Sequence, residues 1–245
     1  LRDGALIAYP TDSCYALGFA LANREGGDRI RRIRGLDDRH HFTLVVSEFA
    51  QLGQLVKLDN ASFRAVKAAT PGPYTFILPA TPEVPRRLAH PKKKTVGVRM
   101  PDHPVVRALV HELGEPLVSS TLLLPDHEEP MTDGWAIKEE LDHVVDAVID
   151  AGETGKEPTT VVDWSEGYPE IVRVGAGDPT RCIPRHRSPR TTSGPSGAPT
   201  TACSTAASPA IRFVPTTRSS RTWRCRRARS SSCPASPPVA AVTGR

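Results

Sequence analysis

The sequence predicts an α/β domain with a mixed sheet, and three observations lead to this fold class. Short runs rich in β-branched and aromatic residues recur along residues 1–178, and segments with helical spacing of apolar residues lie between several of them. No segment repeats at a fixed period, which argues against a solenoid. Strands and helices that alternate in one chain are typical of an α/β domain.

Eight segments are expected to form strands, because each combines β-forming residues with turn or charged residues at its ends. They are residues 5–9, 43–47, 74–78, 95–99, 117–124, 144–150, 160–163 and 170–174. The clearest helix is expected to begin at an Asp102 N-cap and to end at Gly114. Between these two residues, apolar side chains from Val105 to Leu113 form one stripe. Further helices are expected near 27–34, 62–69 and 136–145.

Residues 179–245 differ in composition from the rest of the chain. They contain 12 Arg but no Asp, Glu or Lys, whereas residues 1–178 hold 27 acidic and 20 basic side chains. This stretch has too little apolar surface to offset its ordering entropy, so we expect a disordered tail. Its densest basic patch, Arg224 to Arg229, would suit a nucleic-acid-binding arm. We favour an alternative, a GC-rich message read out of frame, because the composition changes abruptly at Arg181.

Composition also limits where the protein works. No run of about 18 apolar residues is present, so a membrane-spanning helix is not expected. The start of the chain lacks a signal-peptide pattern, and Cys14 is the only cysteine of residues 1–178, which fits a reducing cytoplasm. The chain does not start with Met, so we expect upstream residues to be missing.

Two of the segments with candidate chemistry lie near the N-terminus. In residues 9–18 (YPTDSCYALG), Thr11 and its neighbours follow a strand, where open α/β sheets bind ligands; a plain turn is the alternative. In residues 30–42 (IRRIRGLDDRHHF), Arg34 and other arginines near a helix end could clamp phosphates, although a solvated helix face is the usual explanation. His40 and His41 are adjacent and point to different sides, so joint metal ligation is not expected.

Two further segments lie on expected strands. Arg99 ends an apolar strand, which makes it a candidate anion ligand. Ser119, Ser120 and Thr121 interrupt an apolar run, and their hydroxyls would be costly there unless they bond to backbone or ligand. No P-loop, no G-x-G-x-x-G and no G-x-S-x-G motif occurs, so the usual nucleotide cradles and a hydrolase triad are not expected.

The ordered series YPTDSCYALG, PGPYTFIL, VGVRMPDHP, GEPLVSS and RVGAGD resembles the YrdC-like family, which includes the threonylcarbamoyl-adenylate synthases. The resemblance covers about residues 5–178. It implies a single YrdC-like domain over residues 1–178, with a twisted sheet and a concave basic face, followed by the tail of residues 179–245.

The resemblance also implies a reaction. L-threonine and bicarbonate give a carbamate, which attacks the α-phosphate of ATP and releases pyrophosphate, and the product feeds tRNA threonylcarbamoyladenosine modification. ATP is then a substrate, Mg²⁺ is its expected companion, and tRNA or double-stranded RNA is a possible partner. Such an adenylyl transfer needs positioning and positive charge around the phosphates.

The family motifs suggest a role for each matching residue. Arg34 and Arg99 would be catalytic, and no residue is expected to ligate a metal. Thr11, Ser119 and Thr121 would contact the substrate, while the nucleotide would be bound by Arg34, Arg99, Ser119, Ser120 and Arg173.

Two departures from the synthase pattern bear on activity. The pattern has Lys-x-Arg and Ser-x-Asn, where this chain has Arg34-Gly35-Leu36 and Thr121-Leu122-Leu123. Losing one preorganised donor costs on the order of 10² to 10³ in rate, so Leu36 and Leu123 could nearly abolish turnover unless Arg31, Arg32 or Arg39 compensates. These replacements and PTDS resemble the YciO branch of the family. The alternative function is therefore nucleotide or double-stranded RNA binding with little or no synthase turnover. The chain also lacks the helix that precedes the first strand in relatives.

Overall fold

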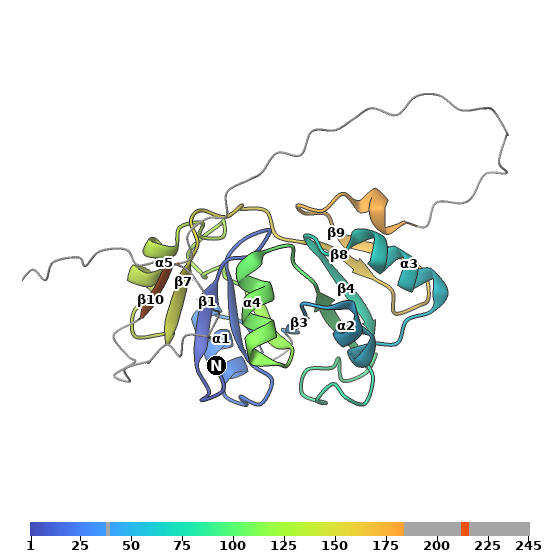
Figure 1. Ribbon diagram of the computed structural model, residues 1–245, viewed down its shortest axis with the longest axis horizontal. Helices are drawn as coiled ribbons and strands as arrows, with labels where there is room; N and C mark the ends of the chain where they lie inside the picture. The colour runs from blue at the N-terminus through green and yellow to red at the C-terminus, as the bar shows by residue number, and fades with distance from the viewer. Residues whose placement is uncertain (38–39, 184–211, 216–245) are drawn as a thin grey trace, which may run out of the picture.

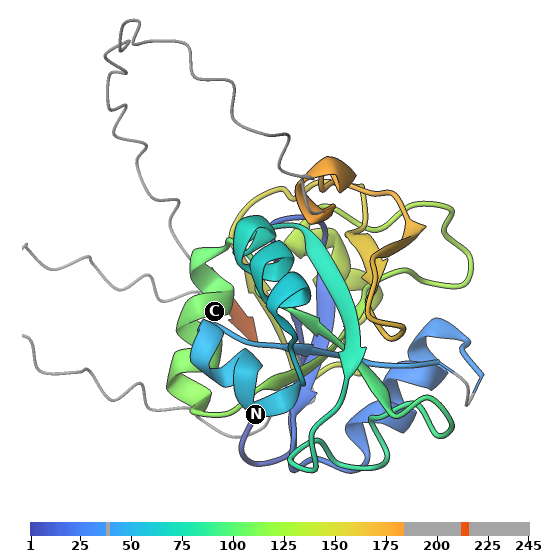
Figure 2. The same ribbon diagram turned by 90° about the vertical axis from the view of Figure 1, so that its right-hand side faces the viewer.

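The computed structural model describes residues 1–37, 40–183 and 212–215, and its centre is one mixed sheet (Figure 1). The strand order is β10-β7-β1-β2-β6-β3-β5-β4-β8-β9. The strands are β1 (Leu6–Tyr9), β2 (Ala16–Ala20), β3 (Thr43–Val45), β4 (Tyr74–Pro79), β5 (Thr95–Arg99), β6 (Leu117–Thr121), β7 (Ala147–Asp150), β8 (Thr160–Asp163), β9 (Glu170–Arg173) and β10 (Arg212–Pro215). The α/β fold class and all eight expected strands are confirmed, and Figure 2 shows how strongly the sheet twists.

Helices pack on both faces of the sheet. They are α1 (Gly26–Arg34), α2 (Phe49–Leu55), α3 (Asn60–Ala69), α4 (Pro104–Leu113) and α5 (Gly134–Glu140). Alternation along β1 separates two cores: Leu6 and Ala8 join the core that holds Ile30 of α1, whereas Ile7 and Tyr9 join the core of α4. Residues of α2, α3 and α5 belong to the first core, so α4 alone among the described helices covers the second face.

The ends of α4 show one correct and one wrong expectation. Gly114 ends the helix in the left-handed conformation, with φ of 77°, as expected. The expected Asp102 cap is wrong, because the side chain of His103 accepts the Val105 N–H at 3.3 Å and Pro104 occupies the first turn. The N–H of Asp102 instead donates to a carboxylate oxygen of Asp12 at 2.9 Å.

The body extends past the boundary expected at Asp178. A 3₁₀ helix, η1 (Pro179–Cys182), follows an Asp178 cap, and Cys182 is fully buried in the first core. Residues 212–215 form β10, which pairs antiparallel with β7. The rest of the expected tail, including Arg224 to Arg229, lies outside the described residues. No helix within the described ranges is long and apolar enough to span a membrane.

Candidate functional site

A cavity of about 700 Å³ opens on the face of the sheet that α4 leaves uncovered. Alternate residues of several strands form its floor, because side chains two apart on a strand share a face. Three consecutive residues of β6, from Ser119 to Thr121, reach the cavity where that strand ends. The floor residues from the other strands are Thr43, Val45, Thr75, Ile77, Thr95, Gly97, Arg99, Val161, Asp163 and Arg173.

One wall carries a cluster of Arg34, Ser120 and His40. Arg34 lies in the last turn of α1, which ends at the left-handed Gly35. Its Nη1 donates to Ser120 Oγ at 2.6 Å, and its Nε donates to the carbonyl oxygen of Leu123 at 3.2 Å. Nε2 of His40 lies 3.0 Å from the same Ser120 oxygen. All three side chains line the cavity.

Arg99 connects the cavity floor to the loop after β1. Its Nη2 donates to Thr11 Oγ1 at 3.0 Å and to Ser13 Oγ at 2.9 Å, and it forms an ion pair with Asp12. Nε of Arg99 is buried without a hydrogen-bond partner in the structure. Burial of such a donor is costly unless a ligand satisfies it. Arg99 is thus both a positioning group for the loop and a candidate ligand contact.

Arg173 and a pair of threonines form the opposite wall. Nε and Nη2 of Arg173 both donate to the carbonyl oxygen of Thr159, at 3.2 and 3.0 Å. The hydroxyl of Thr159 is in turn 2.8 Å from that of Thr75 on β4. These contacts hold the guanidinium of Arg173 at the cavity surface without neutralising its charge.

The protein itself satisfies the hydroxyl of Ser119. Ser119 Oγ donates to the carbonyl oxygen of Leu17 at 3.2 Å, so it accepts from the Tyr9 hydroxyl at 2.6 Å. Burial raises the pKa of Tyr9 to about 12, which keeps that phenol protonated as a donor. Thr121 lines the cavity beside it.

The charges of the cavity favour an anion. Arg34 and Arg173 make no ion pair with any described carboxylate. Burial lowers the pKa of Arg34, and the charge of Arg173 lowers it further. Burial likewise lowers the pKa of Arg173, with a contribution from Arg99. Two half-buried guanidiniums that repel one another would be stabilised by a bound anion.

The acidic side chains at the cavity rim are held by lysines. Glu129 accepts from Lys156 Nζ at 2.8 Å, and Asp163 lies 3.9 Å from Lys93 Nζ. No group of three or more His, Cys, Asp or Glu residues in the described part of the chain could hold a metal ion. A divalent cation in this cavity would therefore depend on the phosphates of a ligand for most of its oxygen donors.

The structure brings most of the expected site residues together. Arg34, Arg99, Ser119, Ser120, Thr121 and Arg173 line the one cavity, although they come from segments up to 139 positions apart in the sequence. Thr11 does not line it; its side chain is buried behind Arg99. Leu123 is part of the wall, so a side chain without a donor faces the ligand space there.

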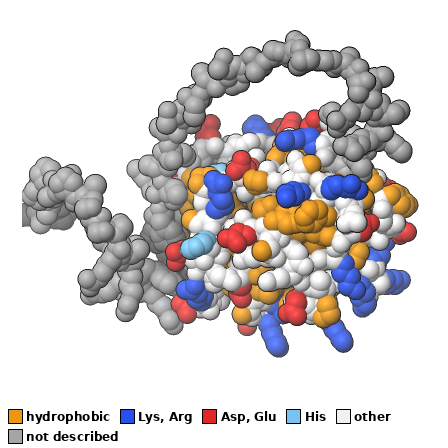
Figure 3. Space-filling view, turned by 45° about the vertical axis from the view of Figure 1, so that its right-hand side comes forward, with side chains coloured by type: hydrophobic (Ala, Val, Ile, Leu, Met, Phe, Trp, Pro, Cys, Tyr) orange, Lys and Arg blue, Asp and Glu red, His pale blue; other side chains and the backbone are white. Residues whose placement is uncertain are grey.

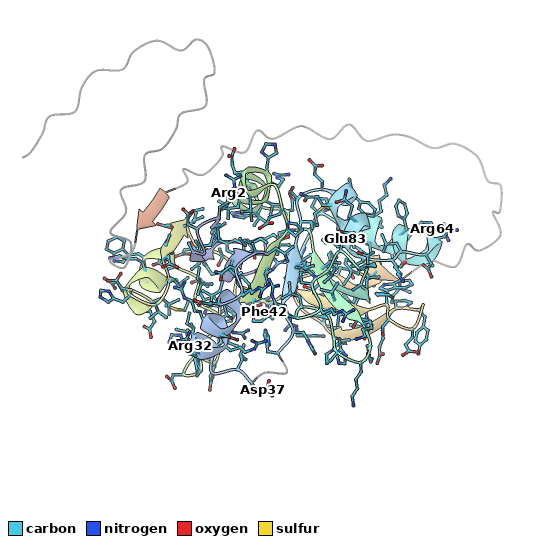
Figure 4. The ribbon with its side chains drawn as sticks, turned by 90° about the horizontal axis from the view of Figure 1, so that it is seen from below. Arg2, Arg32, Asp37, Phe42, Arg64 and Glu83 are labelled. Carbon is cyan, nitrogen blue, oxygen red and sulfur yellow. The ribbon has the colours of Figure 1, made fainter. Side chains whose placement is uncertain are left out.

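Two of the arginines expected to compensate for Leu36 point elsewhere. Arg31 pairs with Asp28 at 2.9 Å and lies over the Phe42 ring, while Arg32 donates to the carbonyl oxygen of Asp28. Figure 4 shows Arg32 and Asp37 at the periphery and Phe42 nearer the middle of the molecule. Arg39 lies outside the described residues.

Sequence reasoning missed His40 and Thr159. His40 was weighed only as a metal ligand beside His41, and adjacency in sequence does not reveal that it bonds to Ser120, 80 positions away. Thr159 precedes a strand and resembles a solvated turn residue. Its role comes from Arg173, which pairs with this region only through the antiparallel register of β8 and β9.

The fold and site together define an α/β protein with a cationic cavity suited to phosphorylated ligands. A family model described as telomere recombination, Sua5/YciO/YrdC, matches residues 1–175. The chain therefore belongs to the Sua5/YciO/YrdC family.

Similarity within this family is greatest for a protein of undefined function. The chain is 46% identical to the uncharacterised protein YciO of Escherichia coli over 178 residues, which cover 73% of this chain and 86% of YciO. The E. coli YciO crystal structure matches with a TM-score of 0.71 at 45% identity, over 74% of this chain and 88% of that one.

Synthase relatives are more distant. Threonylcarbamoyl-AMP synthase of Bacillus subtilis is 29% identical over 180 residues, covering 71% of this chain and 51% of the relative. Pyrococcus abyssi Sua5 in complex with L-threonine matches with a TM-score of 0.65 at 29% identity, again covering 71% of this chain and 51% of that one. The chain thus spans about half the length of these synthase relatives.

Proposed function

We propose that the cavity binds ATP and that the protein is an ATP-dependent nucleotidyltransferase of the L-threonylcarbamoyladenylate synthase type. The observation that carries this proposal is the placement of Arg34 and Arg173 on one cavity with no described carboxylate paired to either. Guanidinium groups held in this way are suited to the phosphates of a nucleotide and to the charge that develops in adenylyl transfer.

In this proposal each residue keeps a specific task. Arg34 and Arg173 hold the phosphates, and Arg99 anchors the Thr11 loop while its unpartnered Nε faces a ligand oxygen. L-threonine and bicarbonate supply the carbamate that displaces pyrophosphate. Mg²⁺ would enter with the triphosphate. The P. abyssi Sua5 complex with L-threonine supports threonine as the amino acid.

A second candidate function is nucleotide or double-stranded RNA binding with little or no synthase turnover. Leu123 favours it, because this wall residue offers no hydrogen bond at a point where the synthase pattern has Asn. The greater identity to YciO than to the synthase points the same way. Since Cys14 and Cys182 both carry free thiols, we propose that the protein acts in the reducing cytoplasm in either case.

Calorimetric titration of the full chain with ATP, with and without L-threonine, tests the proposal when combined with a pyrophosphate assay. The synthase proposal predicts saturable ATP binding and pyrophosphate release that depends on threonine and bicarbonate. Binding without threonine-dependent release selects the second candidate. RNA binding predicts an affinity that falls steeply with salt and survives deletion of residues 216–245. The absence of ATP binding rejects both nucleotide proposals.

A further inference from the structure

The hydrogen bonds around Ser120 have a polarity that a proton can reverse. Arg34 has no acceptor, so its 2.6 Å contact makes Ser120 Oγ the acceptor. The single hydroxyl hydrogen of Ser120 is then free to point at His40 Nε2, 3.0 Å away. In this state His40 is neutral and carries its proton on Nδ1. The hydroxyl is occupied by the protein and offers nothing to the cavity.

Protonation of His40 changes what the hydroxyl can do. Nε2 then carries a hydrogen and must donate to Ser120 Oγ, which already accepts from Arg34. The Ser120 hydrogen is released from His40 and needs another acceptor. Ser120 is 94% buried and lines the cavity, so a phosphate oxygen bound beside Arg34 would be that acceptor.

The charges around His40 oppose protonation until an anion is present. Burial, then Arg34 and Arg31 of α1, then His41, lower the pKa of His40 to about 4, while Asp37 raises it. From β6, the neutral Ser120 faces the ring, and Phe42 packs edge-on with ring centroids 5.4 Å apart. An anion against Arg34 would cancel the main repulsive charge and would itself attract an imidazolium.

We propose that Arg34, Ser120 and His40 form an anion subsite in which a phosphate group binds together with one proton, taken up by His40. The inference rests on the proposed nucleotide binding and deepens it, since it makes the affinity for phosphates depend on pH. Protonated His40 supplies positive charge and reorients Ser120 as a donor only when the ligand is bound. Affinity for ATP should rise as pH falls below neutrality, by up to about tenfold per pH unit.

Calorimetry of the full chain tests this coupling. ATP is titrated at pH 6 in two buffers of different ionisation enthalpy, so that the dependence of the heat on the buffer counts the protons taken up. His40→Gln keeps a polar side chain that cannot be protonated. His41→Gln is the matched control, because His41 also lines the cavity but packs against His90, with ring centroids 4.8 Å apart.

Wild type and His41→Gln should take up more protons per ATP than His40→Gln, by a difference approaching one. Ser120→Ala should also reduce the uptake, because the hydroxyl that links the two groups is gone. Equal uptake in wild type and His40→Gln overturns the inference while leaving ATP binding intact. If ATP does not bind at all, the proposed function falls and this inference falls with it.

A second measurement does not depend on heats. In the chain labelled at histidine, the NMR titration of His40 should show a pKa raised by saturating ATP. A titration curve that ATP does not move would contradict proton uptake at this residue.

Discussion

Asp12 and Arg99 form a buried ion pair, with side chains that are 9% and 8% exposed. The second carboxylate oxygen of Asp12 accepts the N–H of Asp102, so one carboxyl group connects the loop after β1, the end of β5 and the approach to α4. The pair explains how a charged residue can end an apolar strand.

Removing one member of this pair leaves the other charge buried alone. Asp12→Ala should therefore lower the free energy of unfolding by about 3 to 5 kcal/mol. Asp102→Ala is the matched control, because its contact with Arg107 spans 3.6 Å between side chains that are more than half exposed, and such pairs contribute under about 1 kcal/mol. Urea denaturation measures both. Equal losses would show that the buried pair has no special weight.

ATP affinity should depend on which arginine of α1 is removed. Arg34→Ala should weaken binding by about ten- to a hundredfold, since a hydrogen bond to a charged group is worth about 1.5 to 3 kcal/mol. Arg32→Ala, two residues earlier and away from the cavity, should change affinity less than threefold at physiological salt. Calorimetric dissociation constants decide this, and similar effects would place the phosphates elsewhere.

Gly175 should not tolerate a side chain. A Cβ at this position would lie 2.0 Å from the carbonyl oxygen of Pro158, a backbone atom next to the Thr159 wall. Gly175→Ala should cost about 1 to 3 kcal/mol and weaken ATP binding through displacement of Arg173. Gly53→Ala in α2 meets nothing within 4 Å and should stabilise the protein by up to about 1 kcal/mol. Thermal melts and ATP titrations of both variants test the contrast.

Stability should fall in mild acid because of His40. Its pKa is about 4 in the folded protein and about 6.5 in the unfolded chain. Between these values the unfolded state binds more protons, so the contribution of neutral His40 to stability is present above pH 6.5 and is lost as pH falls towards 4. Melting temperatures at pH 7.5 and 5 should drop less for His40→Gln than for wild type. The exposed His111→Gln should behave like wild type.

The strands of the sheet were predictable wherever β-branched residues carried the signal. β2 was not predicted, because Ala16–Ala20 is fully buried, has no polar alternation and contains Gly18. The helix α2 was missed for a related reason: Phe49–Leu55 has only seven residues and includes Gly53. Short apolar segments carry too little periodicity to separate strand, helix and loop.

For the candidate site, sequence motifs predicted the members but not their contacts. Arg34 and Ser120 lie 86 positions apart, and no local pattern shows that they bond. The sequence also gave no reason to separate Thr11 from the cavity residues, since only the packing of Arg99 places it behind them. Residue types can be read from the chain, whereas which hydroxyl is already satisfied depends on the final packing.

The strand order has a consequence for how quickly the cavity can form. Neighbours such as β4 and β8, or β1 and β7, pair in parallel although roughly a hundred residues separate them in the chain. Long loops must close before such pairs gain anything, which places folding in the slow range for a domain of this size. Because Arg173 lies in β9, a nascent chain still held by the ribosome before that strand would have no complete phosphate-binding cavity.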